Sequence, residues 1–424
     1  MGGMKEKVSL LLKTTTFRNS ATFTIYSVLN KTINFLLLFV IANYVSPEGY
    51  GKIDLFNTTV LLLGYFISLN TTSVISVNYF SYSKQQLRES ISCVLILTLL
   101  GGLLFSSSIL FFGKISSIIG LRSIFILYAI IVSISNVVYD IILNIWRLEE
   151  NLKQYGVYSI GIVLLNFVLT ILLIVHCRLG WTGRVYAQVV SYLILATIGV
   201  YALLKKNLIG FYLPKKSVFL DSLRFGLPLI PHSISFWLRQ GLDRYLINFF
   251  YSSTVLGCYS FALNFANIIQ MVGTALNATY SVTIYKKLAE NNVIVVQSLL
   301  KNSRIVAFVF TILTVFIVCI SFVFIPVFFP NYSDSLSYLI FLSLGSLAQC
   351  IYLLYVNYIF YYKRTKILMY ITFSTSLLHA ILSIIVVKYS LMYIAVLNAI
   401  TNIVIMLLVY IYARKLINQH FNNE

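Results

Sequence analysis

Long apolar runs separated by short polar connections dominate the chain. A membrane-spanning helix takes about 20 apolar residues, and twelve runs are long enough. The predicted helices cover residues 20–45, 53–79, 91–112, 118–143, 156–177, 184–204, 223–250, 255–285, 305–329, 336–361, 367–387 and 392–413. The connections are too short to hold a separate catalytic domain. The pattern therefore predicts an all-α integral membrane protein whose function operates within or across the bilayer.

The composition supports this prediction. Hydrophobic residues make up 59% of the 424 residues, charged residues only 10%, and the mean hydropathy is +0.89. A soluble domain is nearer 45–50% apolar and about 25% charged, so a cytosolic enzyme, a secreted disulfide module and a disordered protein are excluded. The five cysteines are isolated, and the chain has neither a CxxC motif nor a Cys/His cluster, so we expect no disulfide framework and no zinc site.

The cations predict the topology. The chain has 31 Lys and Arg against 12 Asp and Glu. With a cytoplasmic N-terminus, 22 cations fall in cytoplasmic segments, 6 in outer segments and 3 within spans, at Lys31, Arg239 and Arg244. This bias obeys the positive-inside rule. It predicts an even number of spans with both termini cytoplasmic, and it explains the basic charge without a nucleic-acid partner.

An offset of 206 residues superposes the starts of two halves. It aligns Arg18 with Arg224, Ser27 with Ser233, Asn34 with Gln240, Ser46 with Ser252, Gly51 with Gly257 and Tyr79 with Tyr285. The same offset divides the twelve spans into six and six, both starting on the same side. We therefore predict two parallel six-helix bundles, residues 1–206 and 207–424, with a cavity between them and alternating access by rocking.

The seventh predicted span is the richest in polar side chains. His232, Phe236, Arg239 and Asp243 share one helical face, with Gln240 and Arg244 beside them. Pro228 and Pro231 predict a kink at the cytoplasmic entrance. The face lines an anion-accepting cavity, or else Arg239 and Asp243 form a structural pair. One carboxylate cannot neutralise two arginines, which favours the cavity.

Polar stripes also mark other spans. In the first span, Lys31 and Asn34 belong to a stripe that predicts a cationic cavity lining, unless Lys31 reaches an interface. In the eighth, Asn264, Asn267 and Gln270 suit either sugar hydroxyls or neighbouring helices.

Two further residues are candidates for ion coupling. Asp140 lies near the cytoplasmic end of the fourth span, and His379 lies within the eleventh. Each has an ordinary alternative, an interfacial carboxylate and a packed histidine. Catalytic residues are not predicted, because no phosphate-binding loop, nucleophile elbow, zinc-protease motif or paired carboxylates occur.

Residues 225–269 resemble the start of the second half of polysaccharide-export flippases of the O-antigen (Wzx) type. These belong to the multidrug/oligosaccharidyl-lipid/polysaccharide (MOP) exporter superfamily. The family pattern is roughly LP-x-x-P-H, a nearby Trp, then D-R and G-x-Y. It is met here by Leu227, Pro228, Pro231, His232, Trp237, Asp243, Arg244, Gly257 and Tyr259. The loop SPEGYG at 46–51 also resembles a family loop.

The resemblance implies a MATE-like fold and a transporter rather than an enzyme. The implied activity moves oligosaccharide repeat units of O-antigen or capsule type, linked to undecaprenyl pyrophosphate, from the cytoplasmic to the outer leaflet of the bacterial inner (plasma) membrane. These units serve lipopolysaccharide or capsule synthesis. The implied partners are membrane lipids, a polymerase and a chain-length regulator. No cofactor is implied beyond a coupling ion, H⁺ or Na⁺.

Two other functions remain open at this stage. A drug/cation antiporter of the same superfamily would share the fold, but it predicts acidic cavity residues. A membrane polysaccharide polymerase would be an enzyme with a sizeable outer loop. The cations within the spans and the short outer loops favour the flippase.

Overall fold

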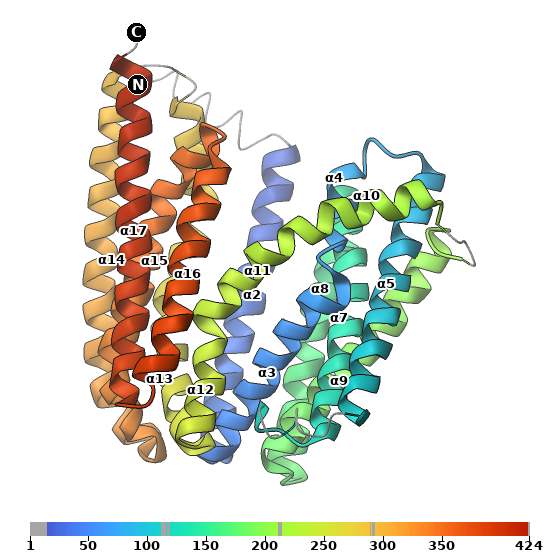
Figure 1. Cartoon of the computed structure of the whole chain (residues 1–424), viewed down its shortest axis with the longest axis horizontal. Helices are drawn as coiled ribbons and strands as arrows, with labels where there is room; N and C mark the ends of the chain where they lie inside the picture. The colour runs from blue at the N-terminus through green and yellow to red at the C-terminus, as the bar shows by residue number, and fades with distance from the viewer. Residues whose placement is uncertain are drawn as a thin grey trace. The chain divides into compact units, whose positions relative to one another are not determined.

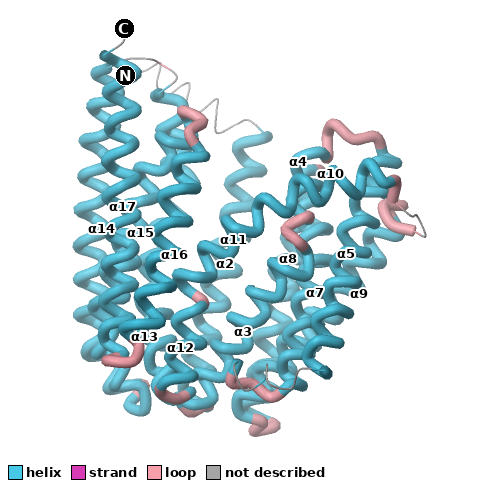
Figure 2. Tube along the Cα trace, in the orientation of Figure 1, coloured by secondary structure: helices cyan, strands magenta, loops and turns pink. Residues whose placement is uncertain are grey.

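The computed structural model is helical throughout the part of the chain that it describes, which is residues 15–111, 116, 119–210, 214–288, 290 and 293–422. Within those residues there is no β-strand, and short turns join the helices (Figure 2). The predicted all-α membrane fold is confirmed.

The chain forms two compact units. Unit 1 contains Met1–Val45 and Phe56–Ile230, and unit 2 contains Ser46–Leu55 and Pro231–Glu424. The predicted bundles, residues 1–206 and 207–424, differ from these units in two places. The change of unit falls after Ile230, and the segment Ser46–Leu55 packs with unit 2 although the helices around it belong to unit 1.

Ten helices in the described part are long and apolar enough to cross a membrane, and eleven if one bent pair counts as a span. The bent pair is α3 (Pro47–Ser68) and α4 (Thr72–Asn78), which meet at 61°. Leu69 and Asn70 make the bend with left-handed backbone, at φ of 49° and 54°. The pair corresponds to the predicted span 53–79.

Unit 1 is built around α7 (Ser123–Leu148), the most amphipathic of its long helices. Besides α4 and the part of α3 from Phe56 onward, the unit contains α2 (Thr15–Tyr44), α5 (Lys84–Phe111), α8 (Leu152–Ile171), α9 (Gly180–Lys205) and α10 (Lys216–Gly226). Side chains such as Ile91, Ile141 and Leu203 form its apolar core. Trp146 packs edge-on against Tyr158, with ring centroids 5.1 Å apart.

Unit 2 is built around α15 (Leu336–Tyr361), which packs mainly against three neighbouring helices. These neighbours are α13 (Ser253–Leu288), α14 (Val293–Phe328) and α17 (Leu391–Asn422), and α16 (Thr365–Val386) packs against α17 (Figure 1). Ile269, Phe310, Leu354 and Val409 lie in the core that these helices share.

The predicted span 223–250 is not one helix. It is divided into α10, the 3₁₀ turn Leu227–Leu229, α11 (Ile230–Gln240) and α12 (Leu242–Phe250). The turn contains Pro228, and Pro231 follows it, as the predicted kink requires. Gly241 separates α11 from α12. The span is therefore jointed at two places, and α12 packs against α13 and α16.

Two glycines allow the starts of α3 and α13 to touch within unit 2. A Cβ at Gly51 would come closer than 3.0 Å to the carbonyl oxygen of Ser253, and one at Gly257 would come equally close to that of Pro47. The contact is reciprocal, because Ser253 and Gly257 are Pro47 and Gly51 shifted by 206 residues. Such reciprocity is what a local two-fold relation between the segments produces, and it supports the repeat.

Candidate functional site

The predicted site residues fall into both units. Lys31, Asn34 and Asp140 belong to unit 1, and their side chains are exposed on it. Arg239, Arg244, Asp243, His379 and the α13 amides belong to unit 2, where most of them are buried or half-buried. Contacts among the predicted residues are therefore found in unit 2.

Arg244 is held by an acid that the sequence analysis did not select. Its Nε lies 2.5 Å from Asp54 Oδ2, and Ser260 donates a hydrogen bond to the same oxygen. Arg244 Nη1 also donates to the carbonyl oxygen of Gln240. Asp54 and Ser260 are separated by the 206-residue offset, so they lie at equivalent positions of the repeat. The charge of Arg244 is thus largely compensated within unit 2.

Asp243 joins a second network, with α16. Its Oδ2 lies 3.2 Å from His379 Nε2, and its Oδ1 accepts a hydrogen bond of 2.8 Å from Ser383. His379 Nδ1 lies 2.9 Å from Thr401 Oγ1 on α17. The side chains of His379 and Asp243 are 0% and 2% exposed. The predicted histidine is therefore partnered with the predicted aspartate, across 136 residues of chain.

Arg239 has a different environment. It is 4% exposed, and its guanidinium makes no hydrogen bond or ion pair with any residue that the structure describes. Its neighbours are the Phe236 ring, whose centroid lies 5.3 Å from the guanidinium carbon, and Tyr352 of α15. The alternative in which Arg239 pairs with Asp243 is wrong, because the joint at Gly241 interrupts the helical spacing and Asp243 contacts α16.

The amide stripe of α13 is used in two ways. Asn264 donates to Tyr50 Oη at 2.7 Å, and Asn277 accepts from Asn357 at 2.7 Å. Asn267 and Gln270, between them, are half-buried and form no hydrogen bond with other residues of the described chain. The ends of the stripe thus join helices, and its middle keeps free donors and acceptors.

The other predicted polar residues have simpler surroundings. His232 is exposed, and its carbonyl oxygen accepts a hydrogen bond of 2.6 Å from Ser235. The side chain of Gln240 is half-buried. Among the residues described, no group of three or more His, Cys, Asp or Glu side chains could hold a metal ion.

Sequence reasoning missed Asp54, Ser260, Ser383 and Thr401. Asp54 was detectable as an acid inside an apolar run, aligned by the repeat with a hydroxyl. Ser383 is one helical turn from His379, the spacing at which side chains share a face. Nothing in the sequence indicated Thr401, because only the packing of α16 on α17 brings it to the imidazole.

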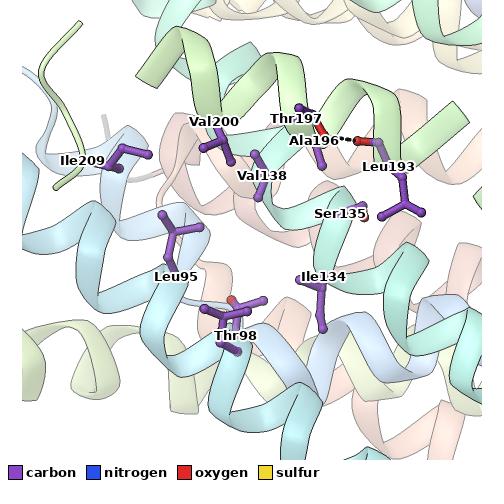
Figure 3. Close-up of a pocket in the computed structure, with 11 residues that line it drawn as sticks. Leu95, Thr98, Ile134, Ser135, Val138, Leu193, Ala196, Thr197, Val200 and Ile209 are labelled. Carbon is purple, nitrogen blue, oxygen red and sulfur yellow. Dashed lines mark hydrogen bonds between the residues drawn. The ribbon is translucent and has the colours of Figure 1, made fainter. Parts of the chain in front are cut away.

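Unit 1 contains a cavity of about 480 Å³ between α5, α7 and α9 (Figure 3). Its lining is almost wholly apolar, with Leu95, Val138 and Val200 among the contributors. Two lining hydroxyls bond to their own helices, Thr98 to Val94 O at 2.7 Å and Thr197 to Leu193 O at 2.9 Å. The cavity offers no charge to a ligand, and it suits hydrocarbon rather than a phosphate or a sugar.

The fold and the buried charges together define the class of an all-helical, multi-pass membrane transporter. A family model described as "Polysaccharide biosynthesis protein" matches residues 16–282, and a second, MatE, matches residues 228–385. The chain belongs to the polysaccharide biosynthesis protein family, within the MOP superfamily.

Similar proteins agree with this assignment. A Lsg-locus protein of Haemophilus influenzae is 24% identical over 83% of this chain and 86% of its own. An uncharacterised membrane protein of the same organism is 25% identical over 82% and 85%.

Solved structures agree on the fold. An inward-facing multidrug-resistance MATE transporter matches with a TM-score of 0.70 and 18% identity, over 93% of this chain and 96% of that one. A MOP superfamily transporter from Pyrococcus furiosus, described by the reverse polarity of its binding pocket, matches with a TM-score of 0.59 and 17% identity. The match covers 95% of this chain and 96% of that one.

Proposed function

We propose that this protein is a flippase that moves undecaprenyl-pyrophosphate-linked oligosaccharide repeat units, of O-antigen or capsule type, from the cytoplasmic to the outer leaflet of the bacterial inner membrane by alternating access. The observation that carries the proposal is Arg239, a buried cation without an acidic partner in the described chain. The family supplies the polysaccharide context.

A buried charge of this kind is costly to maintain. A charged side chain at the centre of a bilayer costs about 2.5–3.5 kcal/mol on insertion scales. Arginine is permanently charged and binds phosphate through two parallel N–H donors. The pyrophosphate of a lipid-linked sugar would supply the charge that Arg239 lacks. Arg244, which Asp54 compensates, has a supporting role in this proposal.

The sugar part of the substrate requires neutral polar groups. Asn267 and Gln270 provide amide donors and acceptors that the described residues leave unused, and we assign them to sugar hydroxyls. Lys31 and Asn34, both exposed on unit 1, are further proposed contacts along the path of the head group. Asp140, also exposed on unit 1, has no part in substrate binding in this proposal.

The environment of the two acids argues against a drug/cation antiporter. Asp54 contacts Arg244, and Asp243, whose side chain is 2% exposed, contacts His379 and accepts a hydrogen bond from Ser383, so the oxygens of both acids are already engaged within unit 2. A membrane polymerase lacks support because the chain has a transporter fold. The positive-inside bias favours two cytoplasmic termini in the inner membrane, with a polymerase and a chain-length regulator as the proposed partners.

The test uses cells in which the gene is deleted and then restored. Deletion is expected to leave lipid-linked single repeat units on the cytoplasmic leaflet. Arg239→Ala should reduce surface polysaccharide roughly 10–100-fold at unchanged protein level, as the loss of a charged hydrogen bond requires. Arg239→Lys should restore part of it, because the charge returns without the paired donors.

The matched control is Arg122→Ala, an exposed arginine at the start of α7, which should leave polymer amount unchanged. Wild-type polymer in Arg239→Ala would remove the anion-binding role. Repeat units that reach the outer leaflet normally in the deletion strain would contradict flipping itself.

A further inference from the structure

The apolar cavity of unit 1 has no part in the proposed function. It lies between α5, α7 and α9, and both α5 and α9 pack against α7 (Figure 3). Leu99 and Leu193 line it with side chains that are 55% and 45% exposed, so the cavity is open at the surface of the unit. An empty cavity forfeits the dispersion contacts of its lining, which favours an occupant.

Hydrocarbon suits this cavity better than water does. A buried water needs two to four polar partners, and none of the described lining residues is charged. The hydroxyls of Thr98 and Thr197 already donate to carbonyl oxygens of their own helices. The volume of about 480 Å³ is that of a small-molecule pocket, about 300–1,000 Å³. It suits one acyl chain, whereas an undecaprenyl chain is several times longer.

One end of the cavity lies beside a guanidinium. Ile209 lies at this end, near Leu95 and Val200 (Figure 3). Arg88 Nε donates a hydrogen bond to the carbonyl oxygen of Asn207, two residues before Ile209. Arg88 also lies seven residues before Leu95, which is two helical turns along the same face of α5. Both relations place the guanidinium at the Ile209 end.

Two exposed lysines add positive charge near this end. Lys84 begins α5, on the same face as Arg88, and Lys205 ends α9, four residues before Ile209. The positive-inside rule predicts that these helix ends face the cytoplasm. The cavity therefore extends from a cationic cytoplasmic end into the apolar part of the unit.

The acids at these helix ends cancel only part of the charge. Glu149 forms an ion pair of 2.6 Å with Lys206, so these two residues balance each other. Glu89 follows Arg88, but it is 6% exposed, and its Oε1 accepts a hydrogen bond from Gln85. Even with Glu89 counted, the cations at the Ile209 end are in excess.

A buried hydroxyl lies between the charge and the cavity. Ser92 is one helical turn after Arg88 and three residues before Leu95. It is 5% exposed, and its Oγ forms no hydrogen bond with any residue that the structure describes. A phospholipid has ester carbonyls between its phosphate and its acyl chains, and such a carbonyl can accept this hydrogen bond. A polyprenyl phosphate has no ester at that position.

We propose that unit 1 binds one anionic phospholipid of the cytoplasmic leaflet, with an acyl chain in the cavity, an ester carbonyl at Ser92 and the phosphate at Arg88 and Lys205. Arginine binds phosphate through paired N–H donors, and basic pockets between membrane helices bind anionic headgroups. Lipid tails are as apolar as leucine, so the chain fills space and the headgroup provides selectivity. The bound lipid joins α5 to α9 across α7.

The first experiment measures which lipid the headgroup site selects. The purified full-length protein is titrated in detergent with dioleoyl phosphatidylglycerol or dioleoyl phosphatidylcholine, and bound lipid is counted by native mass spectrometry. The wild type should bind one phosphatidylglycerol about tenfold more tightly than phosphatidylcholine. Arg88→Gln and Lys205→Ala should each remove most of this preference, because a charged hydrogen bond is lost. Lys153→Ala, an exposed lysine of the same unit, should keep it.

The second experiment blocks the cavity. Ala196 lines it from α9, so Ala196→Phe fills space that the acyl chain requires. This variant should bind phosphatidylglycerol about tenfold more weakly. Ile198→Phe is the matched control, because Ile198 is exposed on the same helix and does not line the cavity. Ser92→Ala should weaken binding less, by about threefold, since one neutral hydrogen bond is removed.

Competition identifies the source of the phosphate. Neither undecaprenyl phosphate nor inorganic phosphate, at the concentration of phosphatidylglycerol, should displace the bound lipid. Displacement by undecaprenyl phosphate would show that the cavity holds a polyprenyl tail, and displacement by inorganic phosphate would show that the chain adds nothing; either would overturn the proposal. Equal binding of the two phospholipids, or unchanged binding in Arg88→Gln, Lys205→Ala and Ala196→Phe, would also overturn it. These measurements need no cargo, so their failure leaves the proposed flippase intact.

Discussion

Two neighbouring helices, α11 and α12, each carry an arginine, and the surroundings of the two guanidinium groups are opposite in character. Arg244, at the start of α12, is paired with Asp54 and also donates a hydrogen bond to the carbonyl oxygen of Gln240. Arg239, at the end of α11, is more deeply buried and has only aromatic neighbours in the described chain. A paired charge contributes to the fold, whereas an unpaired buried charge lowers stability, and in the proposed function the anionic substrate compensates it.

Removing Arg244 should have the largest effect on stability. Arg244→Met leaves the half-buried Asp54 without this guanidinium, and breaking a buried pair typically costs about 3–5 kcal/mol. The measurement is unfolding of the detergent-purified protein. Adding Asp54→Asn should recover more than half of the loss, because the remaining charge is removed. Strictly additive losses would mean that the pair is not coupled.

Removing Arg239 should change the free energy of unfolding in the opposite direction. Arg239→Met eliminates an uncompensated charge, so the free energy of unfolding should rise, by at most about 3 kcal/mol. Surface polysaccharide should fall in the same variant. A loss of stability comparable to that of Arg244→Met would show that Arg239 has a structural partner, and the comparison between the segments would fail.

The approach of α3 to α13 supports the pair on α12, since these helices carry Asp54 and Ser260. Gly257→Ala places a Cβ against the backbone of Pro47, and such overpacking costs about 1–3 kcal/mol. Gly64→Ala is the matched control, because a Cβ there meets nothing within 4 Å. Equal unfolding free energies for the two variants would contradict the close contact.

The smallest effect concerns the neutral amides. Asn277→Leu breaks the hydrogen bond with Asn357 and should cost about 0.6 kcal/mol, the average for such bonds between membrane helices. Asn267→Leu, on the same stripe, should leave stability unchanged and reduce polymer amount. If both variants lose stability and neither affects polymer, the middle of the stripe has only a structural role.

The positions of the helices are easier to predict from the sequence than the contacts between them. Apolar runs locate the long helices because the bilayer demands a minimum length, and Pro228 and Pro231 mark the first joint. Gly241 was not recognised as the second joint, because one glycine within a polar stripe gives a weak signal. This omission affected the prediction of the site, because a continuous helix would have placed Arg239 beside Asp243.

The side-chain networks depend on contacts between distant segments. Asp243 and His379 were each selected from sequence because ionisable residues within spans are costly. Their mutual contact was not predicted, since 136 residues separate them and helical periodicity relates only positions on one helix. The contact between Asp54 and Arg244 was not predictable for the same reason, because the two residues lie on different helices.

The segment Ser46–Leu55 has a consequence for how the protein is made. It packs with unit 2, but it is synthesised long before the rest of that unit, and Arg244 follows Asp54 by 190 residues. At 5–20 residues per second, the interval is about 10–40 s. During this time the carboxylate of Asp54 enters the membrane region without the guanidinium that later neutralises it. We therefore expect the nascent α3 to depend on the insertion machinery until translation reaches α12.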